Sequence, residues 1–426
     1  MMVIRLVKIR DNLETLPASG IALLLHIGEN QDILSLGIGE PDFKTPSHIV
    51  EAAIESLRRG ETHYTPDPGT IKLREAIVNK TKRDNGFDVN PESEVMVTAG
   101  TSPGVFGAIF GCVNKGDEIV IPTPAYLAYE PIIRIAEAKP VTVPGPEEDS
   151  FVPTADEIAE SITPKTKMII ICSPNNPTGG VWNRESVKAV SDLAVDHDLR
   201  ILSDELYEKL VYDDFKTTSP AALSGMFERT ITINGLSKSH AMTGFRLGWV
   251  IGSQEIIAGF KKIHQYSSIC APSTSQAAGV AALNGPQECV QEMLEEYNRR
   301  RTLLVSRINK EVPFISTTMP KGSFFLMANI QELVETHEED MRNYFKTDGK
   351  AFLEQIPDYL FQIEDLNRSG SLTTMMYLAS AAKVLTASGA SFGSGGEGFL
   401  RLSYAQTYEK INEAVDRIIA ALEPWT

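Results

Sequence analysis

One lysine stands in a setting that is unusual for a charged side chain. Lys238 follows an apolar run at residues 230–233 and lies among serines, glycines and a methionine rather than among other charges. Judged alone, it would be an ordinary surface residue, because lysine is rarely buried. Arg246 follows in the same stretch and supplies a second cation. A lysine amine beside an anion-binding group could anchor an aldehyde cofactor as a Schiff base.

Other residue types capable of chemistry also follow strand-like runs. In open α/β sheets, ligands bind beyond the carboxyl ends of the strands, because the connecting loops converge there. Four strand-like runs besides the one before Lys238 end in such residues. They are the glycine-rich turn Gly100, Thr101 and Ser102, the ring Tyr126, the amide Asn176, and the pair Asp204 and Tyr207.

These residue types match what pyridoxal 5'-phosphate needs besides its lysine. A carboxylate such as Asp204 keeps the pyridine nitrogen protonated, so that the ring can accept electrons. The phosphate favours a helix N-terminus and a bidentate cation such as Arg246. Tyr207 and Asn176 can donate hydrogen bonds to the ring oxygen, which lowers the pKa of the Schiff-base nitrogen. Tyr126 offers a flat face for the ring.

Each residue alone also has a purely structural explanation. Asp204 could cap a following helix, and residues 175–179 form a good turn sequence. Tyr126 could be a packing residue, and Ser237 could be a local backbone partner. Only the combination of these residues at successive strand ends favours a cofactor site.

The elements that must position these residues alternate between strands and helices. Apolar β-rich runs predict strands at residues 94–98, 118–121, 168–172, 200–203, 230–233 and 247–251. Between two of them, an apolar helical face is formed by Val187, Val190, Leu193 and Ala194, and the opposite face by Arg184, Glu185, Lys188, Ser191 and Asp192. This alternation is typical of βαβ units, so we expect an α/β fold with a largely parallel sheet covered by helices.

The length of 426 residues predicts two domains. A charged amphipathic pattern at residues 290–312 predicts a helix that leads out of the strand-rich region. The later stretch 332–371 resembles an insertion with one or two short helices, and its end at residues 367–371 reads as a loose tail.

Composition excludes several classes of function. The formal charge of −16 argues against nucleic acid and anionic membranes as partners, because both attract clustered Lys and Arg. No run reaches the ~18 apolar residues of a membrane helix, and the histidines show no metal-ligand spacing. The four widely spaced cysteines predict buried free thiols in a reducing compartment. We therefore expect a cytoplasmic protein without a metal site.

Six ordered motifs resemble those of fold-type I, class I aminotransferases, with archaeal and bacterial aspartate or aromatic aminotransferases as the nearest likeness. The likeness covers nearly the whole chain, which makes it specific. The motifs are SLGIGEPDF (35–43), THYTPDPGTIKLREAI (62–77), SPNNPTGG (173–180), SDELYEKLVYD (203–213), NGLSKSHAMTGFRLGW (234–249) and GEGFLRLSYA (396–405).

The resemblance implies an architecture. A large cofactor-binding domain at residues 46–295 would carry a mainly parallel seven-stranded sheet between helices. A smaller α+β domain would be built from residues 296–426, with the insertion near 332–371, and from part of the N-terminal arm at residues 1–45.

The resemblance also implies a role for each matching residue. Lys238 would form the internal aldimine and carry the proton, with Asp204 on the pyridine nitrogen and Tyr207 and Asn176 on the ring oxygen. Tyr126 would stack on the ring. The phosphate would be bound by Gly100, Thr101, Ser102, Ser237 and Arg246.

Three further residues would act on substrate or across subunits. Arg401 would bind the substrate α-carboxylate, Gly39 would touch the same group through its backbone, and Asn176 would also line the substrate site. Tyr64 would reach the phosphate in a neighbouring subunit, which implies a homodimer. Taken alone, Arg401 could instead be a solvated edge residue, and Gly39 a turn glycine.

The implied reaction moves the amino group of an L-amino acid, aspartate or aromatic, to a 2-oxo acid such as 2-oxoglutarate. A pyridoxal-phosphate enzyme of the same fold that carries out elimination, such as a carbon–sulfur lyase, is the alternative. A cofactor-binding regulator ranks last, because such proteins add a DNA-binding segment and this chain is strongly acidic.

Overall fold

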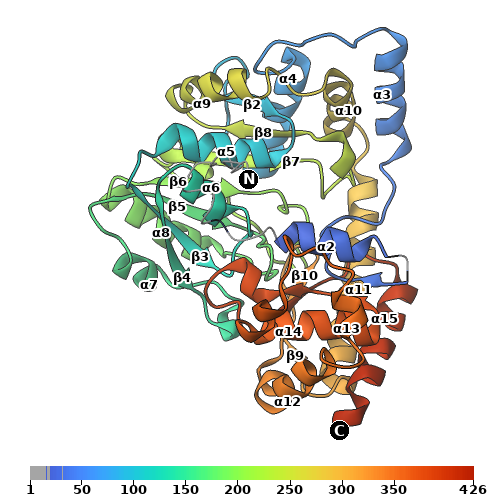
Figure 1. Cartoon of the computed structure of the whole chain (residues 1–426). Helices are drawn as coiled ribbons and strands as arrows, with labels where there is room; N and C mark the ends of the chain where they lie inside the picture. The colour runs from blue at the N-terminus through green and yellow to red at the C-terminus, as the bar shows by residue number, and fades with distance from the viewer. Residues whose placement is uncertain (1–15, 17–19, 31) are drawn as a thin grey trace, which may run out of the picture.

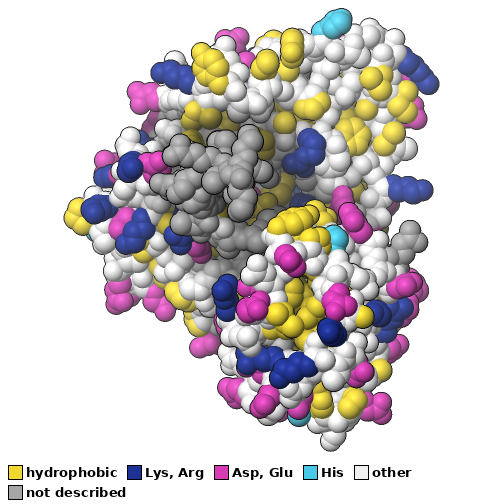
Figure 2. All heavy atoms as spheres, viewed as in Figure 1, with side chains coloured by type: hydrophobic (Ala, Val, Ile, Leu, Met, Phe, Trp, Pro, Cys, Tyr) yellow, Lys and Arg dark blue, Asp and Glu magenta, His cyan; other side chains and the backbone are white. Residues whose placement is uncertain are grey.

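The computed structural model describes residue 16 and residues 20–30 and 32–426, so part of the predicted N-terminal arm lies outside the described residues. Two bodies make up the molecule (Figure 1): one is built on a large sheet, and the other contains the C-terminus. Figure 2 shows the surface hollowed between them, with acidic and basic side chains interspersed on the visible face.

The large sheet has seven strands in the order β2-β8-β7-β6-β5-β3-β4. β8 is antiparallel to both of its neighbours, and the other pairs are parallel. This confirms the predicted α/β class and the mainly parallel sheet. The strands are β2 (Val95–Thr98), β3 (Glu118–Thr123), β4 (Lys139–Pro144), β5 (Thr166–Cys172), β6 (Arg200–Asp204), β7 (Thr230–Gly235) and β8 (Gly248–Ile251).

Helices cover both faces of this sheet because its central strands are apolar on both sides. In β5, Met168 and Ile170 belong to one core cluster, whereas Ile169 and Ile171 belong to another. Side chains alternate along a strand, so a continuous apolar run serves two cores. The first face carries α5 (Thr101–Cys112), α6 (Tyr129–Ile135) and α9 (Gln254–Ser267). The opposite face carries α7 (Ala155–Glu160), α8 (Arg184–Asp196), α4 (Ile71–Lys80) and α10 (Ser273–Asn284), and α3 (Ser47–Arg58) packs on α10.

Two details of this region differ from the prediction. Strand β4 was not predicted, because it begins and ends with Lys139 and Pro144 and contains Pro140, as an edge strand can. On α8, Ser191 is buried rather than on the polar face. Its hydroxyl donates to the Val187 carbonyl at 2.7 Å, which satisfies the buried group locally.

The second body has its own sheet and core. Its antiparallel strands follow the order β12-β13-β10-β9, and β1 pairs in parallel with β11. The N-terminal helix α2 (Gly20–Gly28) lies beside these C-terminal elements (Figure 1). The strands are β1 (Leu34–Ser35), β9 (Ser316–Thr317), β10 (Phe325–Asn329), β11 (Val384–Leu385), β12 (Ala387–Ser388) and β13 (Phe399–Ser403). The helices are α11 (Glu288–Glu311), α12 (Gln331–Tyr344), α13 (Lys350–Leu353), α14 (Gly370–Tyr377) and α15 (Tyr408–Leu422).

Helix α11 confirms the predicted connecting helix, but the prediction of a loose tail at residues 367–371 is wrong. Ser369 caps α14 by accepting a hydrogen bond from the Leu372 N–H at 3.0 Å. Ser371 is fully buried, and its backbone N–H donates to Glu397 at 3.0 Å. A Gly-Ser stretch that reads as a linker is therefore a helix start.

The four cysteines are free, but only Cys172 is buried, so the prediction of buried thiols is wrong for Cys112, Cys270 and Cys289. In the described part of the chain, no helix is long and apolar enough to cross a membrane.

Candidate active site

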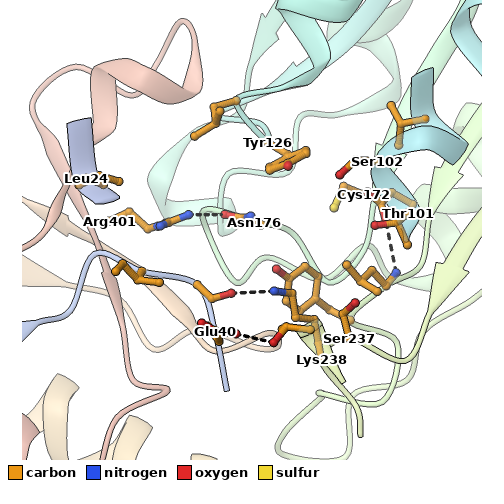
Figure 3. Close-up of a pocket in the computed structure, with 18 of the residues that line it drawn as sticks. Leu24, Glu40, Thr101, Ser102, Tyr126, Cys172, Asn176, Ser237, Lys238 and Arg401 are labelled. Atoms are coloured by element: carbon orange, nitrogen blue, oxygen red, sulfur yellow. Dashed lines mark hydrogen bonds between the residues drawn. The ribbon is translucent and has the colours of Figure 1, made fainter. Parts of the chain in front are cut away.

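A cavity of about 330 Å³ lies at the carboxyl ends of the central strands and is closed on one side by the second body. Five loops after strands of the large sheet and one strand of the second body contribute to it (Figure 3). Most of the predicted site residues meet here. They are Gly39, Thr101, Ser102, Tyr126, Asn176, Asp204, Tyr207, Ser237, Lys238, Arg246 and Arg401.

Lys238 lies on the turn after β7, and its Nζ donates to the Gly39 carbonyl at 2.7 Å. Burial lowers the pKa of Lys238 to about 8, although the nearby Glu40 carboxylate acts in the opposite direction and the cations Arg401 and Arg246 lower it further. A large fraction of the amine is therefore neutral near pH 8, as a nucleophile or base requires.

Asp204 ends β6 directly beside Cys172 of β5. Its Oδ2 accepts the Tyr129 hydroxyl at 2.7 Å, and its Oδ1 accepts the Leu206 N–H at 3.2 Å. Burial raises the pKa of Asp204, and these two donors oppose that shift. Each oxygen keeps a free lone pair, so the carboxylate can accept one further N–H from a ligand.

Arg401 lies in β13, with its guanidinium 4.4 Å from the centre of the Phe325 ring. One terminal nitrogen donates to Asn176 Oδ1 at 2.9 Å, the other donates to the Gly37 carbonyl, and Nε has no partner. Among the described residues no carboxylate forms an ion pair with it. Burial lowers the pKa of Arg401 to about 10, so the group is still a cation at neutral pH. A buried guanidinium without a counter-ion is a site for an anionic ligand.

Asn176 and Tyr207 are both buried and both lie near Arg401. Asn176 accepts a hydrogen bond from Arg401, and the Tyr207 ring packs against the Phe325 ring that Arg401 also contacts. Because the Asn176 oxygen accepts from Arg401, its amide NH₂ remains available to donate to a ligand. The Tyr207 ring packs edge-on against Phe324 and Phe325, which fixes its direction. Burial raises the pKa of Tyr207 well above its ordinary value, so the hydroxyl keeps its proton and can donate it.

Gly39 and Gly100 make close approaches that other residues would prevent. A Cβ on Gly39 would lie 2.6 Å from Cζ of Phe325, the ring that also contacts Arg401. Gly100 has φ +92°, and a Cβ there would collide with the Arg246 guanidinium. The second approach brings a cation to the beginning of α5.

The first turn of α5 and its neighbours form an anion-binding corner. Thr101 begins the helix and Ser102 follows, so their backbone N–H groups lack intrahelical partners. Ser237 adds a hydroxyl, and Arg246 adds a guanidinium whose Nη1 donates to the Thr243 carbonyl at 3.0 Å. The helix dipole and the cation both favour a phosphate here.

Tyr126 and Lys238 lie across the cavity from each other (Figure 3). The Tyr126 ring meets the Tyr129 ring edge-on, with centroids 5.5 Å apart, so its orientation is fixed. Burial raises the pKa of Tyr126, which keeps the phenol neutral. A flat aromatic ligand bound between Tyr126 and Lys238 would have one face against a ring.

Two predicted site residues do not line this cavity. Gly100 directly precedes α5 and approaches the Arg246 guanidinium from there. The other is Tyr64. It is 81% exposed, on a loop bound to α10. Gln276, fully buried, holds the loop: its amide donates to Thr65 Oγ1 at 2.8 Å, and its carbonyl accepts the Thr70 N–H at 2.8 Å. The loop therefore holds an aromatic side chain out from the chain's own surface.

Sequence reasoning missed several residues of the site. Tyr129, the partner of Asp204, carries no signal of its own, because a tyrosine in an apolar helix reads as packing. Glu40 directly follows Gly39 in the first motif and could have been noted; its carboxylate accepts the Thr243 hydroxyl. Cys172 and the α2 residue Leu24 also line the cavity. Among the described residues, no group of His, Cys, Asp and Glu could hold a metal ion.

Residues 31–418 match the family described as aminotransferase class I and II. The chain is 38% identical to an aromatic-amino-acid aminotransferase 2 of Thermococcus litoralis, over 97% of this chain and 98% of that protein. It is 40% identical to an aspartate aminotransferase of Pyrococcus abyssi, over 96% of both chains. The solved structure of an aromatic aminotransferase from Pyrococcus horikoshii superposes with a TM-score of 0.81 at 38% identity, covering 95% of this chain and 99% of that one.

Proposed function

The chain belongs to the family of class I and II aminotransferases, and from this premise we propose that it transfers amino groups with pyridoxal 5'-phosphate bound in the cavity around Lys238. The observation that carries the proposal is the presence of two unusual cations in one cavity. They are Lys238, whose pKa is lowered, and Arg401, which is buried and has no carboxylate partner among the described residues. The first fits an aldehyde, and the second fits a substrate carboxylate.

The residues that line or border the cavity fit the phosphate, the ring nitrogen, the ring oxygen and the ring face of the cofactor. Gly100, Thr101, Ser102, Ser237 and Arg246 would bind the phosphate. Asp204, which keeps a lone pair on each oxygen, would accept the pyridinium N–H. Asn176 and Tyr207 would donate to the ring oxygen, and Tyr126 would cover one face of the ring. When bound, the cofactor supplies an electron sink for the bonds at the substrate α-carbon.

The protein groups have separate tasks in the reaction. The Lys238 amine would hold the aldehyde carbon of the cofactor, and once free it would take the proton from the substrate α-carbon as a general base. Arg401 binds the α-carboxylate with its two terminal nitrogens, assisted by the Gly39 backbone and by Asn176. Asp204 would hold a proton at the ring nitrogen of the bound cofactor. These contacts orient the α-carbon toward Nζ of Lys238.

The names of two relatives support an aspartate or an aromatic amino acid as the donor. A 2-oxo acid such as 2-oxoglutarate would be the acceptor. We assign Tyr64 to the active site of a second copy of the chain, because it is exposed, held on a fixed loop, and absent from the cavity of its own subunit. A homodimer, a cytoplasmic location and domain boundaries at residues 1–45, 46–295 and 296–426 complete the proposal.

Cofactor absorbance tests the proposal directly. Purified protein mixed with pyridoxal phosphate should develop a visible band that L-aspartate or L-phenylalanine bleaches and 2-oxoglutarate restores. The Lys238→Ala variant should lose the band, whereas Lys188→Ala on the surface of α8 should keep it. Full transamination by Lys238→Ala would overturn the assignment. Release of pyruvate and ammonia from cysteine without an oxo acid would instead identify an elimination enzyme.

A further inference from the structure

A cluster of buried charges lies behind the turn that carries Asp204 and Tyr207, outside the active-site cavity. Its centre is an ion pair between Lys80 and Glu208, whose side chains are 5% and 7% exposed. Lys80 is the last residue of α4, and Glu208 directly follows Tyr207 in the chain. The pair therefore ties a helix on one face of the sheet to the turn at the end of β6.

Asn85 makes the ion pair part of a network. It ends a single π-helical turn, η1 (Thr81–Asn85), which continues α4. Its Nδ2 donates to Glu208 Oε2 at 2.7 Å, and its Oδ1 accepts from Lys80 Nζ at 2.7 Å. Short π turns in helices are frequent at functional sites. Here the turn brings the amide within reach of both charges.

A second carboxylate of the same turn joins the network. Glu205 Oε1 accepts the Ser203 hydroxyl at 2.9 Å and the Ser219 hydroxyl at 2.6 Å. Asn85 Nδ2 lies 3.4 Å from its other oxygen. Glu205 and Glu208 directly follow Asp204 and Tyr207, and both have polar partners outside the active-site cavity. Glu205 accepts from two hydroxyls, and Glu208 pairs with the ammonium group of Lys80.

Neighbouring residues of this turn line different cavities. Asp204 and Tyr207 line the active-site cavity, whereas Glu208 lines a small separate cavity behind it. Residues 234–236, just before Lys238, line that rear cavity as well. Lys80 and Glu208 therefore share this rear cavity with the turn that leads to Lys238.

Resting on the proposed function, we propose that Lys80 and Glu208 are positioning residues for transamination: their buried ion pair fixes the turn so that Asp204 and Tyr207 meet the cofactor in the required orientation. An arrangement of this kind matters because small displacements of reacting groups cost large factors in rate. Burial by itself would raise the pKa of Glu208, yet Lys80 and Asn85 hold it below its ordinary value, so the carboxylate stays ionised.

The test uses the enzyme loaded with pyridoxal phosphate and three variants: Lys80→Met, Glu208→Leu and the double variant. We expect each single variant to shift the pH midpoint of the cofactor absorbance change by at least about half a unit, because Tyr207 and Asp204 set that midpoint. We expect kcat to fall by roughly ten- to a hundred-fold while KM changes little. Both single variants should also lower the unfolding temperature, since each leaves one buried charge unpaired.

The double variant separates positioning from stability. It removes both charges, so it should regain most of the unfolding temperature but keep the shifted midpoint and the lowered kcat. Val190→Ala, which thins the core under α8, serves as a destabilised control and should leave the midpoint and kcat unchanged. If the single variants fail to fold, the double variant carries the test.

Two results would overturn the proposal. The first is that the single variants lose stability but keep the pH midpoint and kcat of the parent enzyme. The second is that the double variant regains the unfolding temperature, the pH midpoint and kcat of the parent enzyme. A parent protein that binds no pyridoxal phosphate would instead overturn the proposed function, and this is measured first.

Discussion

Two buried cations near the turn after β6, Lys80 and Arg401, differ in whether a carboxylate neutralises them. Lys80, behind the turn, contacts the Glu208 carboxylate and the Asn85 amide oxygen. Arg401, in the cavity, has an amide oxygen, a backbone carbonyl and aromatic rings around it, but no carboxylate among the described residues. Removing a charge from water is costly unless a partner repays the cost. The paired cation is therefore part of the framework, and the unpaired one is suited to bind an anionic ligand.

The largest expected effect comes from removing the unpaired cation. Arg401→Met should lower kcat/KM by about a hundred- to a thousand-fold, because the substrate carboxylate loses its charge partner. The unfolding temperature of the cofactor-free protein should change little, since no ion pair is broken. Steady-state kinetics and thermal unfolding measure the two quantities.

Arg301 supplies the matched control. It is also a buried arginine, but it binds Asp213 at 2.7 Å and the Pro320 carbonyl at 2.7 Å. Arg301→Met should therefore lower the unfolding temperature and leave kcat/KM nearly intact. If Arg401→Met behaved like Arg301→Met, the distinction between framework and binding cations would be wrong.

The next largest effect is the pH dependence of stability that Glu205 confers. Glu205 belongs to the network with Lys80, Asn85 and Glu208, called here the rear network. Unlike Glu208, it has hydroxyls and an amide as hydrogen-bond partners rather than a cation. Burial, with the negative charge of Glu208, raises the pKa of Glu205 from 4.5 to about 7. Between these pH values the folded state binds the proton more tightly than the unfolded state, so this contribution to stability is complete below pH 4.5 and is lost as the pH rises through 7. At ~1.4 kcal/mol per pKa unit, the loss amounts to about 3 kcal/mol.

Urea unfolding of the cofactor-free protein between pH 5 and 8 measures this contribution. The free energy of unfolding of the parent protein should fall with pH relative to that of Glu205→Gln, which cannot ionise. If the free energies of unfolding of the two proteins changed in parallel with pH, the pKa of Glu205 would not be raised by folding, and the prediction would be wrong.

The smallest effect is expected for Tyr129→Phe, which removes one hydroxyl from Asp204 and keeps the ring. Because a hydrogen bond to a charged group contributes about 1.5–3 kcal/mol, kcat should fall by roughly tenfold and the cofactor should bind more weakly. Tyr377→Phe is the control, since its hydroxyl donates to the Ala421 carbonyl in the second body. A Tyr129→Phe enzyme with unchanged kcat would mean that Leu206 N–H alone orients Asp204.

Most strands of the large sheet could be predicted from the sequence, because the central strands are nearly continuous apolar segments followed by polar turns. The turns after these strands carry Lys238, Asp204 and Asn176. Because ligands bind beyond the carboxyl ends of parallel strands, the sequence alone predicts that these residues meet. Strand β4 was missed because prolines at an edge position remove the usual pattern. The loose tail was a wrong prediction because a serine cap and a linker share the same residue types.

The contacts that support the site were outside the reach of sequence reasoning. Tyr129 approaches Asp204 from a helix on another connection, and Lys80 approaches Glu208 from α4, far away in the chain. Such pairs depend on how helices pack against the sheet, which periodicity does not specify. The role of Tyr64 stays a prediction, because it involves a second copy of the chain.

The loop that carries Tyr64 is already fixed by Gln276 within a single subunit. A segment that folds only upon docking would lose conformational entropy at that step, whereas this one has lost it during folding of the monomer. Association through this surface would therefore resemble the docking of two preorganised bodies, with a rate governed by encounter and orientation rather than by loop rearrangement.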